Sequence, residues 1–268
     1  VYSDKGDYDR AIADYSEAAR LNPKYPKAAF GRGNAYEYKG DHDRAIADYA
    51  EAIRIDPKYT SAFNNRGLVY QRKGDYDRAV AGYGEAIRLN PKDAEVLVNR
   101  AIANRLKEYY DRAHADLAEA IRLDPKYARA FANRAITYRA QNDNDRALAD
   151  YTTAISLAPT NGAYFNNRGN IYQAKQDYDR ALADFTTSIG LDPKPANTFN
   201  NRGVAYRGKR DYDRAIADFT KAIELNPQYA VAFRNRGLSY FDKRDYDRAV
   251  ADYGEAIRID PKYAGALN

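Results

Sequence analysis

Residues 62–91, AFNNRGLVYQRKGDYDRAVAGYGEAIRLNP, carry the pattern that decides the fold. Within this stretch, Phe63, Arg66, Gly67 and Tyr70 follow the i, i+3, i+4, i+7 spacing of one helix face. Asparagine and glycine are weak helix formers, yet Asn64, Asn65 and Gly67 all stand inside this predicted helix. The stretch therefore predicts a first helix that tolerates unfavourable residues for some other purpose.

A second helix follows after a break. Gly74 can end the first helix, and Asp75 is placed to cap the next one. The apolar face of the second helix consists of Ala79, Tyr83, Ala86 and Ile87. Pro91 then stops it, because the residue before a proline avoids helical angles. The stretch is predicted to form a helical hairpin.

The same pattern returns every 34 residues along the chain. Prolines mark this period at positions 23, 57, 91, 125, 159, 193, 227 and 261. Self-similarity at this length is typical of stacked units, none of which buries its own apolar face alone. We predict an all-α array with a partial repeat at 1–25, full repeats at 26–59, 60–93, 94–127, 128–161, 162–195, 196–229 and 230–263, and the start of another at 264–268.

Composition narrows the function classes. Of the 268 residues, 43 are basic and 38 are acidic, and this mixed charge argues against a dedicated nucleic-acid-binding protein. Cysteine is absent, which excludes disulfides, thiol catalysis and thiolate metal sites. His42 and His114 stand at different places in their repeats, so no metal pair or catalytic triad is expected. We predict no catalytic residue, no metal and no cofactor.

The repeat resembles the tetratricopeptide repeat, whose signature is W-x2-L-G-x2-Y, then A-x3-F, Ala and Pro. In this chain the signature sites hold Phe63, Arg66, Gly67, Tyr70, Ala79, Tyr83, Ala86 and Pro91. The resemblance covers the whole chain and is weakest in repeat 94–127. It implies a right-handed superhelical solenoid of antiparallel helix pairs. It also implies a non-enzymatic scaffold that binds a partner protein in a concave groove.

Arginine replaces the leucine of the family signature and lies on the packed face, where a charge needs a partner. In an antiparallel hairpin with this register, Arg66 faces residue 82 or 83. The residue equivalent to position 82 is aspartate in six repeats: Asp48, Asp116, Asp150, Asp184, Asp218 and Asp252. We predict an internal arginine–aspartate pair in each of these repeats. Gly82 breaks the series, so we expect Arg66 to find another acceptor.

An asparagine recurs beside the arginine. The series comprises Asn65, Asn99, Asn133, Asn167, Asn201 and Asn235, and the family resemblance places it on the concave groove. An amide offers one donor and one acceptor group, which complements a peptide backbone. The series is similar to the asparagine ladder of O-linked N-acetylglucosamine transferase, and we expect its side chains to be exposed. A merely solvated polar position is the open alternative.

Further candidate peptide contacts share the groove side of the first helices: Asn170, Arg105, Arg139 and Arg207. The three arginines predict a basic middle groove and a neutral to acidic ligand. The expected partner is therefore a protein or peptide segment in extended conformation.

Other readings of the sequence remain. Single-stranded RNA binding is the alternative function, although a base-reading code would vary from repeat to repeat where this asparagine series is constant. A carboxylate clamp is not expected, because Glu95 and Asn99 stand where it needs cations. No apolar run is long enough to span a membrane, and a cytoplasmic location is favoured over export.

The two ends are complementary parts of one first helix, with Tyr2 equivalent to Tyr70 and Leu267 equivalent to Phe63. We therefore expect either a longer natural chain or head-to-tail self-association as a structural array.

Overall fold

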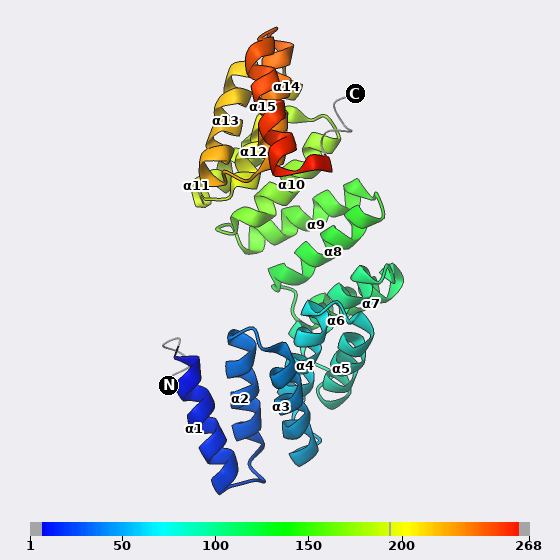
Figure 1. Cartoon of the computed structure of the whole chain (residues 1–268). Coiled ribbons are helices and arrows are strands. Elements are labelled where there is room, and N and C mark those ends of the chain that lie inside the picture. The colour runs from blue at the N-terminus through cyan, green and yellow to red at the C-terminus, as the bar shows by residue number, and fades with distance from the viewer. Residues whose placement is uncertain (1–6, 193, 263–268) are drawn as a thin grey trace. The chain divides into compact units, whose positions relative to one another are not determined.

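The computed structural model describes residues 7–192 and 194–262, which form fifteen α-helices and no strand (Figure 1). The predicted all-α array of helix pairs is confirmed. The helices are α1 (Tyr8–Leu21), α2 (Pro26–Tyr38), α3 (His42–Ile55), α4 (Thr60–Arg72), α5 (Tyr76–Leu89), α6 (Ala94–Leu106), α7 (Tyr110–Leu123), α8 (Ala128–Ala140), α9 (Asn144–Leu157), α10 (Gly162–Ala174), α11 (Tyr178–Leu191), α12 (Ala196–Gly208), α13 (Tyr212–Leu225), α14 (Ala230–Asp242) and α15 (Tyr246–Ile259).

The turn between α4 and α5 follows the predicted chemistry. The N–H of Asp75 donates to the carbonyl of Tyr70 at 2.9 Å, and this bond closes the end of α4. Gly74 makes the closure possible because its φ of 77° lies in the left-handed region. The Asp75 side chain then accepts from the N–H of Arg78 at 3.1 Å and caps α5.

The core of each repeat lies between its two helices. Ala79, Tyr83 and Ala86 of α5 are fully buried, and Phe63 of α4 covers them. A Cβ added at Gly67 would lie 2.8 Å from Tyr83 Cε1, so only glycine permits this approach of α4 to the ring. This close approach explains why a weak helix former stands at the position of Gly67.

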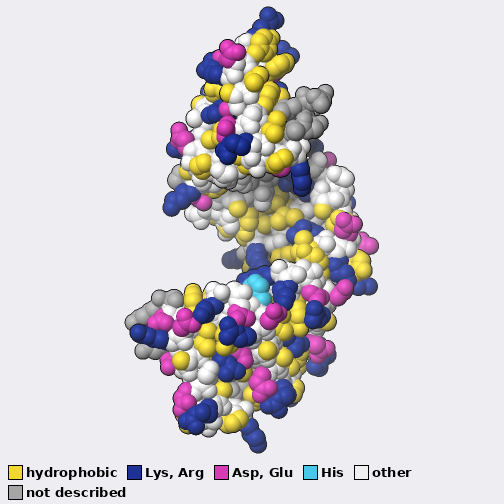
Figure 2. Space-filling model, in the orientation of Figure 1, with side chains coloured by type: hydrophobic (Ala, Val, Ile, Leu, Met, Phe, Trp, Pro, Cys, Tyr) yellow, Lys and Arg dark blue, Asp and Glu magenta, His cyan; other side chains and the backbone are white. Residues whose placement is uncertain are grey.

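The array divides into two compact units, an N-terminal unit of residues 1–137 and a C-terminal unit of residues 138–268, and the division falls within α8. Basic and acidic side chains alternate over the visible face of both units (Figure 2). The handedness of the whole array stays a prediction.

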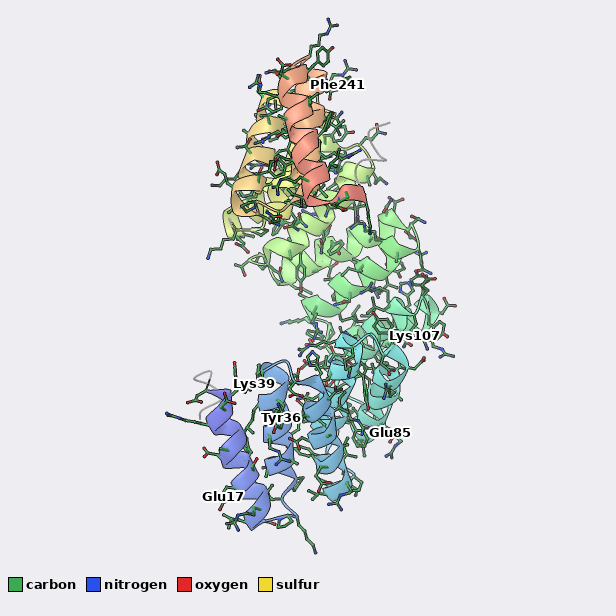
Figure 3. All side chains as sticks on the ribbon, in the orientation of Figure 1. Glu17, Tyr36, Lys39, Glu85, Lys107 and Phe241 are labelled. Carbon is green, nitrogen blue, oxygen red and sulfur yellow. The ribbon has the colours of Figure 1, made fainter. Side chains whose placement is uncertain are left out.

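Exposed ion pairs connect neighbouring repeats and also form along the second helices. Lys39 pairs with Asp9, and Lys107 pairs with Asp77, each across thirty residues. Figure 3 labels the two lysines, which lie in different repeats of the N-terminal unit. Glu85 and Arg88 form a 2.9 Å pair on α5, and their side chains are 48% and 65% exposed. Pairs this exposed contribute little to stability.

Candidate peptide-binding face

The signature arginines serve the interior of the repeat. In the C-terminal unit, Arg202 donates from Nε and Nη2 to the two carboxylate oxygens of Asp218, both at 2.8 Å. The carboxylate raises the pKa of Arg202, and Asp218 is only 6% exposed. The same two-pronged pair forms between Arg32 and Asp48, Arg100 and Asp116, Arg168 and Asp184, and Arg236 and Asp252. The structural role is confirmed for these five, and the pair of Arg134 with Asp150 stays a prediction.

Arg66 departs from the expectation. Its Nε is buried, and among the described residues it has no hydrogen-bond partner. The predicted alternative acceptor is therefore wrong for this atom, because Gly82 offers no carboxylate and no other acceptor reaches it. The guanidinium lies 5.6 Å from the centre of the Phe63 ring.

The asparagine series is less exposed than predicted. Asn99 is 1% exposed and Asn235 is 9% exposed, whereas the other four side chains are half-buried. The expected exposure is therefore wrong, most clearly for Asn99 and Asn235. Both side chains pack against the first helix of the preceding repeat instead of projecting into solvent.

Hydrogen bonds between repeats explain this burial. Asn99 Nδ2 donates to Asn64 Oδ1 at 3.1 Å. The equivalent bonds run from Asn201 to Asn166 at 3.1 Å and from Asn235 to Asn200 at 2.9 Å. The acceptors Asn64, Asn166 and Asn200 are each the first residue of an Asn-Asn dipeptide. This repeated dipeptide could have predicted the hydrogen bonds between repeats, which were not expected from the sequence.

The N-terminal unit uses more of its asparagine groups internally. Asn65 donates to Asn34 at 3.0 Å and accepts from Asn64 at 3.2 Å. Asn99 also accepts from Arg129 at 2.8 Å, and Asn133 donates to the Arg129 carbonyl at 2.8 Å. The amides of Asn65 and Asn99 are therefore engaged on both their nitrogen and oxygen atoms.

Helix α10 of the C-terminal unit differs from this pattern. Asn167 makes one long contact, accepting from Asn166 Nδ2 at 3.5 Å. Asn170 is half-buried, and it has no hydrogen bond within the described residues. Gln173 Oε1 is buried, also without a partner among those residues. Asn167, Asn170 and Gln173 are three apart on one helix, and we call them the α10 polar stripe.

A single ring substitution explains the unsatisfied glutamine. In the N-terminal unit, the Tyr83 hydroxyl of α5 donates to Gln71 Oε1 at 3.2 Å. Phe185 of α11 occupies the position equivalent to Tyr83, and Gln173 occupies that of Gln71. Since phenylalanine has no hydroxyl, the Gln173 oxygen loses its internal donor.

The predicted basic groove is reduced. Arg207 Nε donates to Asp242 at 2.8 Å, so the positive charge on α12 is offset by a carboxylate of α14. Glu37 pairs with Arg72 in the same manner in the N-terminal unit. Arg105 is half-buried on α6, and Arg139 is exposed near the end of α8.

The described residues contain no group of three or more His, Asp or Glu side chains that could hold a metal ion. Within the same ranges, no helix is both long enough and apolar enough to cross a membrane.

Stacked helix pairs with a polar first-helix face define a helical-repeat protein. Two sequence models described as tetratricopeptide repeat match the chain, one over residues 1–60 and the other over 60–93, 128–161, 163–195, 196–229 and 230–263. The chain belongs to the tetratricopeptide repeat family. Residues 94–127, the repeat with the weakest signature, lie outside these matches.

Solved structures show the same fold. A tetratricopeptide repeat protein from Parabacteroides merdae is 23% identical with a TM-score of 0.72, and the match covers 89% of this chain and 94% of that one. The Cut9–Hcn1 assembly of APC/C matches with 16% identity and a TM-score of 0.73 over 88% of this chain, which spans 46% of that chain. YrrB, described as having an unusual peptide-binding site, is 22% identical with a TM-score of 0.53, over 69% of this chain and 95% of its own. A comparison with curated proteins found no match.

Proposed function

We propose that the protein is a non-enzymatic scaffold that binds an extended peptide segment along its first helices. The α10 polar stripe carries this proposal, because it holds hydrogen-bonding groups that have no partner among the described residues. A buried polar group without a partner is costly, and a bound peptide backbone would satisfy both amide donors and acceptors. The peptide-binding site named for YrrB supports the choice of ligand class.

The geometry of the repeat suits an extended ligand. Packed helices lie about 8–10 Å apart, and an extended chain advances about 3.3 Å per residue. One asparagine per repeat therefore contacts about every third residue of the ligand, whatever its side chains. The proposed contacts are Asn133, Asn167, Asn170 and Asn201, with Arg105 and Arg139 beside them. Asn65, Asn99, Asn235 and Arg207 instead bond to neighbouring side chains.

Peptide selection followed by mutation tests the proposal. Blocked peptides selected from a random dodecapeptide library on the full chain should lose affinity in an N167A/N170A variant. Each lost hydrogen bond should cost about 0.5–1.5 kcal/mol of binding free energy, measured by calorimetry. Circular dichroism should show an unchanged fold, because neither side chain holds a strong internal bond.

Asn144→Ala, on α9 outside the stripe, is the matched control and should bind as the parent does. Equal affinity of the parent and the double variant would reject the stripe as the binding face. Binding of single-stranded RNA in place of every peptide would reject the function itself.

A second proposed contact is with another copy of the chain. Val250 and Tyr246 of α15 are 69% and 54% exposed and lie one helical turn apart, so they leave an apolar face on this helix. Light scattering over a wide concentration range tests this, since a mass of 30.3 kDa at every concentration would contradict it.

A further inference from the structure

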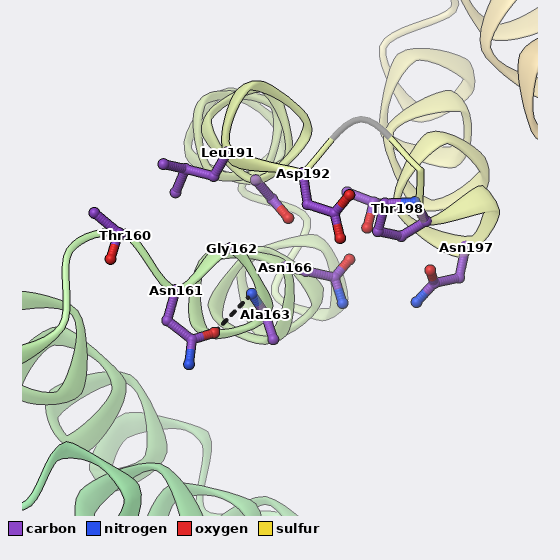
Figure 4. Close-up of a pocket in the computed structure, with 11 residues that line it drawn as sticks. Thr160, Asn161, Gly162, Ala163, Asn166, Leu191, Asp192, Asn197 and Thr198 are labelled. Atoms are coloured by element: carbon purple, nitrogen blue, oxygen red, sulfur yellow. Dashed lines mark hydrogen bonds between the residues drawn. The ribbon is translucent and has the colours of Figure 1, made fainter. Parts of the chain in front are cut away.

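A polar pocket of about 530 Å³ lies where α10, α11 and α12 meet in the C-terminal unit (Figure 4). Figure 4 shows Asn166, Asp192 and Thr198 turned toward its centre from three different segments of the chain. Ser188 and Pro195 also line the pocket. The volume falls within the range of small-ligand sites.

The same place in the N-terminal unit is filled. Between α2, α3 and α4, the rings of Phe30 and Tyr59 lie 4.9 Å apart and pack against Ala52 and Ala62. Four repeats further along, these positions hold Asn166, Pro195, Ser188 and Thr198. The ring at the place of Tyr59 has been lost, and the ring at the place of Phe30 lies one residue earlier, at Phe165. Two alanines are replaced by hydroxyl residues, so an apolar core has become a polar cavity.

The two hydroxyls have unused hydrogen-bonding capacity. Ser188 is 3% exposed and Thr198 is 1% exposed, and neither side chain has a hydrogen-bond partner within the described residues. Other repeats place alanine at the position of Ser188, which shows that packing alone does not require a hydroxyl there. Both residues line the pocket, so a bound ligand can reach these hydroxyls and use their donor and acceptor capacity.

The charge of the lining selects the ligand. Asp192 is the one ionisable residue that lines the pocket, and the exposed Lys194 beside it is not part of the lining. The carboxylate of Asp192 and the hydroxyls of Ser188 and Thr198 can each accept a hydrogen bond from a ligand, and they come from separate segments of the chain. Arginine matches this arrangement because its planar guanidinium carries five donors and a permanent charge.

We propose that this pocket binds the guanidinium of an arginine side chain. As a subsite for a bound peptide, it rests on the proposed function, since Asn166 also contacts Asn167 and Asn201 of the binding face. The arginine backbone would lie along α10 while its side chain enters the pocket.

A single blocked amino acid tests the pocket apart from the peptide face. Acetyl-arginine methylamide should produce saturable NMR shifts at the amides of Gly162, Ala163 and Thr198 in the full chain. The neutral citrulline analogue has nearly the same shape without the charge, so its binding should be much weaker. Asp192→Asn should weaken arginine binding about tenfold, because a charge-assisted hydrogen bond is lost.

Asp56→Asn is the matched control. Asp56 occupies the same repeat position, and each aspartate accepts a backbone N–H two residues on, at 2.9 Å from Lys58 and 3.0 Å from Lys194. Its substitution should leave binding unchanged. The N166F/P195Y variant places rings at the positions that Phe30 and Tyr59 hold in the N-terminal unit and should abolish binding while circular dichroism reports an intact fold.

Three outcomes would overturn the inference: no saturable shift at these amides, equal binding of citrulline, or an equal effect of Asp192→Asn and Asp56→Asn. Peptides that bind the parent chain without any arginine preference would also overturn it and leave the proposed function standing. If the arginine amide binds but no selected peptide does, the pocket is supported and the peptide scaffold fails.

Discussion

The helix pair α4–α5 of the N-terminal unit and the pair α10–α11 of the C-terminal unit share the same repeat pattern, but they leave different atoms unsatisfied. In α4–α5, the Tyr83 hydroxyl donates a hydrogen bond to Gln71 Oε1, whereas Arg66 Nε has no partner among the described residues. In α10–α11, Arg168 is held by Asp184, whereas Gln173 Oε1 has no such partner. One substitution in each second helix, Gly82 or Phe185, moves the defect from the packed interior to the proposed binding face.

This contrast separates two uses of a repeated sequence. A polar atom left without a partner in the interior between helices only weakens the repeat. An amide without a partner on a half-buried side chain of a first helix, such as Asn170, can be reached by a ligand, whereas Gln173 Oε1 itself is buried. The following three changes test the contrast, from the largest expected effect to the smallest.

Asp184→Ala should destabilise the C-terminal unit by about 3–5 kcal/mol, because it leaves the Arg168 guanidinium partly buried without its carboxylate. Chemical denaturation monitored by circular dichroism measures the loss. Asp179→Ala on the same helix is the control, since Asp179 is 82% exposed in its pair with Lys209 and its removal should cost under about 1 kcal/mol. Similar losses of stability in the two variants would show that the internal pair of Arg168 and Asp184 stabilises the fold no more than an exposed pair does.

Tyr83 should make the N-terminal unit sensitive to alkali. Burial raises the pKa of Tyr83 above its ordinary value of about 10. The stabilisation from the protonated ring is thus complete below about pH 10 and is lost as the pH rises toward the folded-state pKa. Above about pH 10, the free energy of unfolding should fall by about 1.4 kcal/mol per pH unit for this residue.

Tyr83→Phe should therefore be less stable than the parent at pH 7, because Gln71 loses its donor, and more stable at high pH. Denaturation at a series of pH values locates the crossover. Tyr38→Phe, at a ring that is 69% exposed, should show none. Parallel pH profiles for the Tyr83 variant and the parent would contradict the role of burial.

Phe185→Tyr should give the smallest effect, a gain of about 1 kcal/mol in stability, by supplying the hydroxyl that Gln173 lacks. If the α10 polar stripe binds peptide, the same variant should bind selected peptides more weakly, because one acceptor is now used internally. Phe219→Tyr is the control, since the position facing it holds Arg207, which already pairs with Asp242. A stability gain without any change in affinity would remove Gln173 from the binding face.

Contacts inside a repeat were largely predictable from the sequence. Asp75 as a cap, Gly67 as a point of close approach and the arginine–aspartate pairs all follow from spacing within one hairpin. Their register is set by a short turn that every repeat shares. The prediction that Arg66 finds another acceptor was wrong for its Nε atom. Spacing shows that the aspartate is missing, but it does not show whether an acceptor from elsewhere can reach the guanidinium.

Contacts between repeats were not predictable in the same way. Spacing placed Asn99 and Asn167 in one series, yet Asn99 is 1% exposed and Asn167 is half-buried. The difference depends on how closely each first helix approaches the next one, and this distance reflects many side chains at once. The pocket beside Asn166 was missed for the same reason, because four separate positions create it together.

The sequence by itself determined the helix pairs, their caps and their internal charge pairs, because each depends on residues within one 34-residue period. Only the tertiary structure decided which asparagines bond to each other and which keep atoms free for a ligand. The physical reason is that a hydrogen bond needs its donor and acceptor within about 3 Å. Packing between repeats sets that distance, and the periodic pattern does not encode it.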